Sequence, residues 1–146
     1  TMPVGAFEEI AFDDWRAYTM PAHHSSRDPL LYMVEHGGKR YLHLCDTGRL
    51  PDDTMDFLKA LGKRADAVSC DCTFLWDDAD PNARHMNLKE AVYTRERLCR
   101  AGVADGATKF VVTHFSHNGA PTAEAVERAE REYGVIAAYD GMTLEI

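Results

Sequence analysis

The stretch YLHLCDTGRLPDDTMDFL, residues 41–58, decides the fold class. Its first part, Tyr41 to Cys45, is an apolar run typical of a buried strand, and Asp52 to Leu61 has the spacing of an amphipathic helix. The strand ends on the carboxylate of Asp46. A carboxylate at the end of a buried strand must be desolvated or partnered. Because sites in α/β sheets form outside the carboxyl ends of strands, we expect Asp46 to hold a ligand.

Strands and helices alternate along the rest of the chain. Apolar alternation and turn residues predict strands over residues 7–12, 15–20, 30–36, 39–45, 67–70 and 109–113, and a final hairpin of 135–139 with 142–146 about Asp140-Gly141. Helices are predicted over 52–61, 88–101 and 122–133, the second with Asn87 as its cap. The pattern predicts an α/β fold, with one sheet of roughly six or seven strands and helices on one face.

Length and charge limit the function classes. The 146 residues predict a single domain, residues 1–146. The formal net charge of −8 argues against non-specific binding to nucleic acid or to an anionic membrane. No apolar run reaches the roughly 20 residues of a membrane span, and no signal peptide is recognised, so we expect a cytoplasmic location. The four cysteines are then expected to be buried free thiols, since the Cys70-x-Cys72 spacing does not match a zinc ribbon.

Acidic and histidine residues follow four of the predicted strands. His23 and His24 follow the second, Asp46 the fourth, Asp71 the fifth, and His114, with His117 three residues later, the sixth. Each has an ordinary structural explanation, such as a turn, a solvated loop or a satisfied core histidine. Together, imidazoles and carboxylates converging from several strands favour a metal site over those explanations.

Other catalytic motifs are missing from the sequence. It contains no phosphate-binding G-x-x-x-x-G-K-[ST], no dinucleotide-binding G-x-G-x-x-G and no G-x-S-x-G elbow. Ser25, Ser26 and Ser116 lie beside histidines, which leaves a Ser–His arrangement formally open. Nothing places these serines on a strained strand-to-helix turn, so the metal site is preferred.

The ordered series of these loops resembles the C-terminal half of the metallo-β-lactamase superfamily, and its phosphoribosyl cyclic phosphodiesterase branch in particular. The resemblance spans nearly the whole chain. It is carried by PAHHS (21–25), DTGRLP (46–51), SCDCT (69–73), HMNLKEA (85–91), VVTHFSH (111–117) and AYDGMTLEI (138–146).

The resemblance implies a role for each site residue. His24 resembles the imidazole ligand of a first metal ion, Asp46 the carboxylate that bridges two ions, and His114 a ligand of the second ion. His85 resembles a histidine that approaches the substrate phosphate and acts as general acid. From the residues alone, His85 reads as an ordinary loop residue before a helix cap. The positions expected to orient ligands or contact substrate are Asp71, His117 and His23, with Asp140 in a structural role.

The resemblance further implies a hydrolase with a zinc or manganese pair, in which a metal-bound hydroxide attacks a small phosphodiester. The family signature H-x-H-x-D-H is absent from this sequence. We therefore expect the C-terminal part of a longer hydrolase, with weak or no metal binding and no activity by itself. The family fold packs two sheets face to face, so the open sheet face would bind the N-terminal half or a second copy in a homodimer. The alternatives are a non-catalytic self-associating or partner-completed half domain, and a hydrolase of another ester or lactone.

Overall fold

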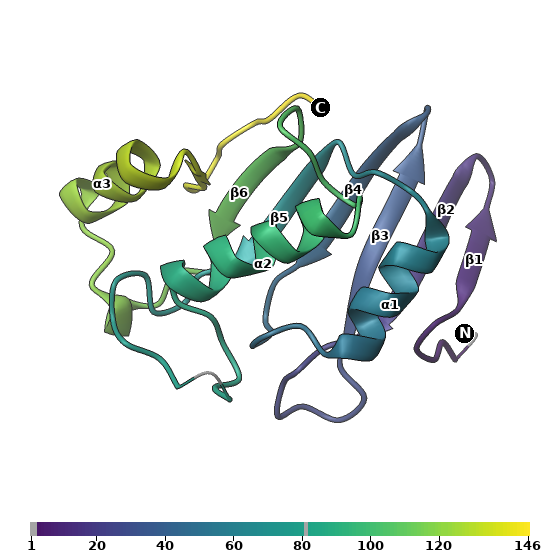
Figure 1. The fold of residues 1–146 in the computed structure, drawn as a ribbon, viewed down its shortest axis with the longest axis horizontal. Helices are drawn as coiled ribbons and strands as arrows, with labels where there is room; N and C mark the ends of the chain where they lie inside the picture. The colour runs from purple at the N-terminus through teal and green to yellow at the C-terminus, as the bar shows by residue number, and fades with distance from the viewer. Residues whose placement is uncertain (1–2, 81) are drawn as a thin grey trace.

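The computed structural model describes residues 3–80 and 82–146 and shows one mixed sheet of seven strands. The strands are β1 (Glu9–Phe12), β2 (Trp15–Pro21), β3 (Leu30–His36), β4 (Lys39–Leu44), β5 (Ala67–Asp71), β6 (Lys109–Thr113) and β7 (Ile136–Ala137). They lie side by side in chain order; β1 to β4 pair antiparallel, and β4 to β7 pair parallel. The carboxyl ends of β4, β5 and β6 therefore meet at one edge of the sheet (Figure 1).

The helices confirm the predicted α/β class. Figure 1 shows α1 (Asp52–Leu61) and α2 (Leu88–Arg100) lying across the same face of the sheet, while α3 (Ala123–Tyr133) contacts β7. A short 3₁₀ helix, η1 (His117–Gly119), precedes α3. The Asn87 side chain caps α2 by accepting a hydrogen bond from the Glu90 amide at 2.9 Å, as the sequence predicts. This cap fixes the start of α2 directly after the loop that carries His85.

The core lies between the helices and one face of the sheet. Alternate residues of the central strands point into it, and Leu42, Leu44 and Val68 are fully buried there. Leu58 of α1 and Leu98 of α2 are fully buried against them. Burying each such side chain stabilises the fold by about 1.5–3 kcal/mol. The core therefore anchors the strands whose ends carry the polar loops.

The opposite face of the sheet carries an apolar groove of about 860 Å³. Val34, Tyr41, Ala67 and Val111 line it from the sheet, and the chain's last residues contribute further apolar side chains, Met142, Leu144 and Ile146. The sheet therefore has one face packed by helices and one apolar face with a wide groove.

The final hairpin predicted over 135–139 and 142–146 is wrong. The second strand of that hairpin does not form, and β7 is only Ile136–Ala137, paired parallel to β6. The predicted turn does occur, since the amide of Met142 donates to the carbonyl of Tyr139 at 3.0 Å. The alternating apolar side chains after this turn, Met142, Leu144 and Ile146, line the groove and do not extend the sheet.

The first strand is shorter than predicted, for a local reason. It begins at Glu9 because Phe7 lies in a turn with φ of 63°, outside the extended region. The hairpin between β3 and β4 forms as predicted, with positive φ at both Gly37 and Gly38. Near this hairpin, Glu35 accepts hydrogen bonds from Arg40 and Lys63, which lower the pKa of its carboxyl group.

The structure bears on two expectations from composition, those about membrane spans and about the cysteines. Among residues 3–80 and 82–146, no helix is long and apolar enough to cross a membrane. All four cysteines are free, and Cys70 and Cys72 are buried, but Cys99 is exposed on α2 and Cys45 is half-buried. The expectation that every thiol is buried is therefore wrong at Cys99, where apolar neighbours in sequence did not reveal the solvent-facing side of the helix.

Candidate metal centre

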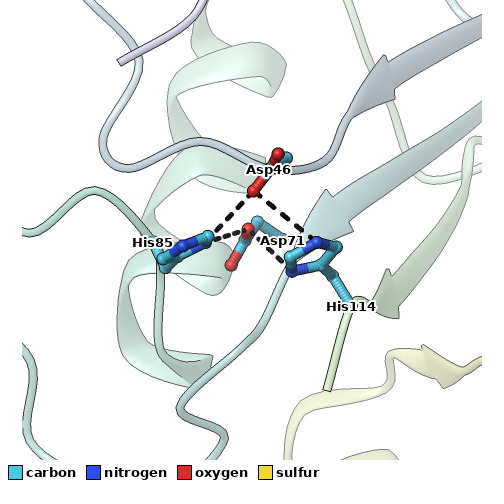
Figure 2. Close-up of side chains that lie close together, drawn as sticks. All are labelled: Asp46, Asp71, His85 and His114. Atoms are coloured by element: carbon cyan, nitrogen blue, oxygen red, sulfur yellow. Dashed lines mark hydrogen bonds and ion pairs between the residues drawn. The ribbon is translucent and has the colours of Figure 1, made fainter. Parts of the chain in front are cut away.

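Two carboxylates and two imidazoles converge at the edge where β4, β5 and β6 end. Asp46, Asp71, His85 and His114 each offer one ligand atom, and these atoms all lie within 4.8 Å of one another. We refer to these four residues as the acid–histidine group. Figure 2 shows the four side chains pointing toward a common centre, with Asp46 above, Asp71 below it, and the two histidines on either side. The sequence separates them by up to 68 positions, so only the fold brings them together.

The backbone is strained at two members of this group. Asp46 lies two residues after the end of β4 and has φ of 59°, and His114 directly follows β6 and has φ of 65°. Residues other than glycine rarely adopt this left-handed conformation, and holding it costs about 1–3 kcal/mol per residue. Both kinks turn a side chain out of the strand's alternation and toward the neighbouring strand ends. Such strain persists where the surrounding structure fixes it, and it is concentrated at functional sites.

Asp71 is fully buried and heavily hydrogen-bonded. One oxygen, Oδ1, accepts hydrogen bonds from the amides of Thr73 and Met86, both at 3.0 Å, and from the Thr73 hydroxyl at 2.9 Å. The other, Oδ2, accepts from the amide of Thr47 at 3.3 Å and lies 3.1 Å from Nδ1 of His85. A carboxylate has about four acceptor positions, so little capacity remains for a metal ion. The bonding pattern makes Asp71 a residue that orients its neighbours.

Thr73 links Asp71 to both histidines, a role that the sequence did not reveal. Its hydroxyl has one hydrogen, which it donates to Asp71, so its oxygen is free to accept from Nδ1 of His114 at 2.9 Å. Nδ1 of His85 lies 3.2 Å from the same oxygen. When Nδ1 of His114 carries the proton, its Nε2 presents a lone pair, and Nε2 lies 3.6 Å from Oδ1 of Asp46. Histidine ligands of metals usually have this arrangement, with the other ring nitrogen hydrogen-bonded behind them.

His24 also approaches Asp46. Its Nε2 lies 3.3 Å from Oδ1 of Asp46, while its Nδ1 contacts the hydroxyl of Ser26 at 3.0 Å. The loop is held there because the amide of Gly48 donates to the carbonyl of His23 at 2.9 Å, and the amide of His23 donates to the Thr47 hydroxyl at 2.9 Å. Oδ1 of Asp46 is therefore close to two Nε2 atoms, those of His24 and His114.

Gly48 brings the loop of His85 against the loop of Asp46. A Cβ atom at this position would lie 1.9 Å from the carbonyl oxygen of Ala83 and 3.0 Å from Nδ1 of His23. The approach is possible only without a side chain. His85 lies two residues after Ala83, with its ring stacked near that of His114 at 5.4 Å between centroids. The ring of His23 packs against Gly48, so this histidine supports the loop.

His117 and Asp140 lie apart from the acid–histidine group. His117 is exposed in η1, and in the part of the chain that the structure describes no hydrogen bond or ion pair joins its side chain to the group. Asp140 is exposed in the turn between Tyr139 and Met142. The structure thus brings together His24, Asp46, Asp71, His85 and His114 and leaves these two outside.

The nearby cysteines do not present reactive thiolates. Burial raises the pKa of Cys45 to about 11 and that of Cys72 to about 12. Both thiols are protonated at neutral pH and are poor nucleophiles or metal ligands in this state.

The donor set fits a divalent metal ion. Two carboxylates lie within a few ångströms of each other, and a cation bound at Asp46 would offset the repulsion between them. Mixed imidazole and carboxylate ligands suit ions of borderline hardness. The orientation of His114 by Thr73 and Asp71 leaves a lone pair at the face where Asp46 lies.

A family model described as the β-lactamase superfamily domain matches residues 2–115. No curated protein matches the chain. Among solved structures, a diphosphatase from the PhnP family has 23% identity and a TM-score of 0.67, and the match covers 96% of this chain and 47% of that one.

Two other solved structures have the same fold at lower identity. Zn²⁺-bound PqqB from Methylobacterium extorquens has 19% identity and a TM-score of 0.63, with 98% of this chain and 51% of that chain covered. The metallo-β-lactamase fold protein YhfI from Bacillus subtilis has 15% identity and a TM-score of 0.62, with 92% and 50% covered. The chain therefore spans about half the length of each of these three structures.

Proposed function

The chain belongs to the metallo-β-lactamase superfamily, and from this premise we propose that it supplies part of the active site of a metal-dependent phosphodiesterase. The observation that carries the proposal is the convergence of two carboxylates and two imidazoles within 4.8 Å at the ends of adjacent strands. The choice of a phosphorus-containing substrate is supported by the similarity to a diphosphatase of the PhnP family. A small phosphodiester is the substrate class that we propose.

The metal ligands in this proposal are His24, Asp46 and His114. Asp46 would be shared between two ions, and its Oδ1 lies 3.3 Å from Nε2 of His24 and 3.6 Å from Nε2 of His114. Zinc or manganese, when bound, supplies Lewis-acid activation of water and neutralises charge on the phosphoryl oxygens. The known fit of imidazole and carboxylate donors to these ions supports the choice of metals.

The chain's other residues orient the site and move a proton. Asp71 and Thr73 hold Nδ1 of both His85 and His114, which fixes the direction of each ring. When the ring of His85 is doubly protonated, its Nδ1–H is donated to Asp71 at 3.1 Å and its Nε2–H could be delivered to the leaving oxygen of the substrate. His85 is half-buried, which leaves part of its ring open to a substrate.

The proposal includes a second segment packed on the open face of the sheet. Three side chains supply too few ligands for two ions with about four ligands each. The apolar groove of about 860 Å³ lies on the face opposite the helices, where an additional sheet could pack. We therefore place the remaining ligands on a segment that covers this groove, and we expect the 146-residue chain alone to be inactive.

Thermal unfolding with and without metal tests the proposed ligands. An ion present at a hundredfold excess over its dissociation constant stabilises a protein by about 2.7 kcal/mol. Zn²⁺ or Mn²⁺ should therefore raise the melting temperature of the wild-type chain, and Asp46→Asn or His24→Ala should remove this response. Asp140→Asn is the matched control, since Asp140 is exposed in a turn away from the group. If Asp46→Asn responds to metal as the wild type does, the ligand assignment fails.

Activity assays test the bond that is cleaved. Bis(p-nitrophenyl) phosphate, p-nitrophenyl acetate and a simple lactone would be compared with the chain alone and with the chain in complex with a covering segment. We expect hydrolysis of the phosphodiester, and only in the complex. Preferential cleavage of the acetate or the lactone would replace the phosphodiester with another ester as the substrate.

The groove also supports a second candidate function, a self-associating or partner-completed domain without catalysis. A large apolar surface of this kind marks an interaction site in many proteins. Sedimentation at several concentrations, with and without metal, separates the two functions. A dimer that forms regardless of metal, together with a melting temperature that metal does not change, would favour the non-catalytic domain.

A further inference from the structure

A second, smaller pocket of about 430 Å³ adjoins the acid–histidine group. Its lining includes Asp46 and His114, and it also includes Tyr41, His43 and Ser69 from the open face of the sheet. The last three are polar residues on a face whose other strand residues are largely apolar, such as Val34 and Ala67 in the neighbouring groove. None of the three belongs to the site as described above.

The three side chains form a closed cluster of hydrogen bonds. The Tyr41 hydroxyl lies 2.6 Å from Oγ of Ser69, and Nδ1 of His43 lies 3.0 Å from Ser69 Oγ and 3.1 Å from the Tyr41 hydroxyl. The thiol of Cys45 donates to Ser69 Oγ at 3.4 Å. Tyrosine and serine hydroxyls and a thiol each bring one hydrogen to the cluster, and the imidazole Nδ1 is the atom best suited to accept without donating.

The number of hydrogens and acceptors in this cluster indicates which ring nitrogen of His43 carries the proton. If Nδ1 accepts from the Ser69 hydroxyl, the oxygen of Ser69 can accept from Tyr41 and Cys45, and every hydrogen has an acceptor. If Nδ1 instead carried a proton, the Ser69 and Tyr41 hydroxyls could bond to each other through only one of their two hydrogens. The other hydrogen would find no acceptor within the cluster, in which Ser69 is only 6% exposed. An unpaired buried polar group is costly, so the first arrangement is favoured. Burial, followed by the nearby His114, lowers the pKa of His43 and favours the neutral ring.

This arrangement leaves Nε2 of His43 as a hydrogen-bond donor beside the pocket. Among the described residues, no hydrogen bond engages Nε2. We propose that His43 positions the substrate by donating its Nε2–H to a phosphoryl oxygen of a ligand that occupies the pocket next to Asp46 and His114. The proposal rests on the proposed function, because it takes a phosphodiester as the ligand. The direction of this donor is fixed, because Tyr41 and Ser69 hold Nδ1 of the same ring.

The tautomer is the first thing to test, and it needs only the wild-type chain. Long-range ¹H–¹⁵N NMR spectra distinguish an imidazole protonated at Nε2 from one protonated at Nδ1. We expect the Nε2–H form for His43, and we expect Ser69→Ala together with Tyr41→Phe to shift it toward a mixture of both. A predominantly Nδ1–H form of His43 in the wild type would overturn the proposal, whatever the behaviour of metal.

Ligand binding is the second test, with dimethyl phosphate as the probe because it is a phosphodiester without hydroxyl groups. It would be titrated into the ¹⁵N-labelled chain with and without Zn²⁺. His43→Asn keeps a polar group near the Nδ1 position and removes the donor at Nε2, whereas His43→Gln keeps a donor near the Nε2 position. We expect His43→Asn to weaken dimethyl phosphate binding about tenfold, equivalent to about 1.4 kcal/mol, and His43→Gln to retain most of the affinity.

The matched control is His36→Asn. His36 lies at the far end of β3, where its ring stacks on Trp15 with 4.1 Å between centroids. Equal affinities for wild type and His43→Asn, or no binding of dimethyl phosphate to the wild type in either condition, would refute the ligand role. Failure of Zn²⁺ to shift the signals of His24 and His114 would count against the proposed function instead. The two failures are therefore distinguishable in one set of spectra.

Discussion

Thr73→Val should weaken metal binding far more than it weakens the fold. Valine has the shape of threonine, so the substitution removes the hydroxyl and leaves the packing nearly unchanged. That hydroxyl lies 2.9 Å from Oδ1 of Asp71, 2.9 Å from Nδ1 of His114 and 3.2 Å from Nδ1 of His85. It is therefore the shared partner of three members of the acid–histidine group.

The loss of metal affinity should exceed the loss of stability, because Asp71 and His114 keep different hydrogen-bond partners after the substitution. Asp71 keeps the amides of Thr73 and Met86, both at 3.0 Å, so losing one more donor should cost the fold about 1 kcal/mol. His114 is left with Oδ2 of Asp71 at 3.5 Å as the partner of its Nδ1. Loss of a residue that orients a histidine ligand usually lowers metal affinity by about 10–100-fold, or about 1.4–2.7 kcal/mol.

Competition with a chromogenic chelator would measure the Zn²⁺ affinity, and urea unfolding of the metal-free chain would measure the stability. Thr73→Ser should restore the affinity, because serine keeps the hydroxyl. Thr94→Val is the matched control, since Thr94 is fully buried and its hydroxyl contacts only the sulfur of Met86 among the described residues. If Thr73→Val folds and binds Zn²⁺ like the wild type, the assignment of Thr73 as an orienting residue is wrong.

Three further predictions concern the loops, the hairpin and the thiols. Gly48→Ala places a Cβ atom 1.9 Å from the carbonyl oxygen of Ala83, so urea unfolding should show a loss of about 1–3 kcal/mol, and a wild-type midpoint would contradict the close approach. Hydrogen bonds from Arg40 and Lys63 lower the pKa of Glu35 from 4.5. The ionised Glu35 therefore contributes to the stability of the fold above about pH 4.5, and this contribution is lost as the pH falls through the lowered pKa. Glu35→Gln should therefore cost stability at pH 7 and flatten the acid side of the stability profile, whereas parallel profiles would exclude the ion pairs as the cause. Iodoacetamide at pH 8 should label exposed Cys99 quickly and Cys45 only on unfolding, because burial raises the Cys45 pKa to about 11. Mass spectrometry of the labelled peptides would measure the order, and labelling of Cys45 before Cys99 would contradict the prediction.

The strands were predictable because their signal is local. The apolar run that opens Leu30–His36 and the glycine pair after it define a hairpin without reference to the rest of the chain. An apolar pattern does not, however, say what its side chains cover. In residues 142–146 the alternating apolar side chains pack into the groove and form no strand, which is why the final hairpin was predicted wrongly.

The site was predictable only in part, for a related reason. Asp46 and His114 could be found because each lies within two residues of the end of a strand. The role of Thr73 depends on the loop of His85 packing against the loop of Asp46, and that approach depends on Gly48. Contacts between loops that are distant in sequence have no periodic signature, so the hydrogen-bonded support of a site is harder to predict than its strand-end residues.

The parallel register of three strands sets the geometry of the candidate metal centre. Leu44, Cys70 and Val112 are partners across β4, β5 and β6, so the residues that follow them begin from one row. Asp71 comes one position after that row, and Asp46 and His114 come two positions after it. In regular strands, positions one and two residues on point to opposite faces. The left-handed backbone at Asp46 and His114 breaks this alternation at both flanking strands, so their side chains can face Asp71 from either side. The strain at these two residues is thus what converts three adjacent strand ends into one convergent site.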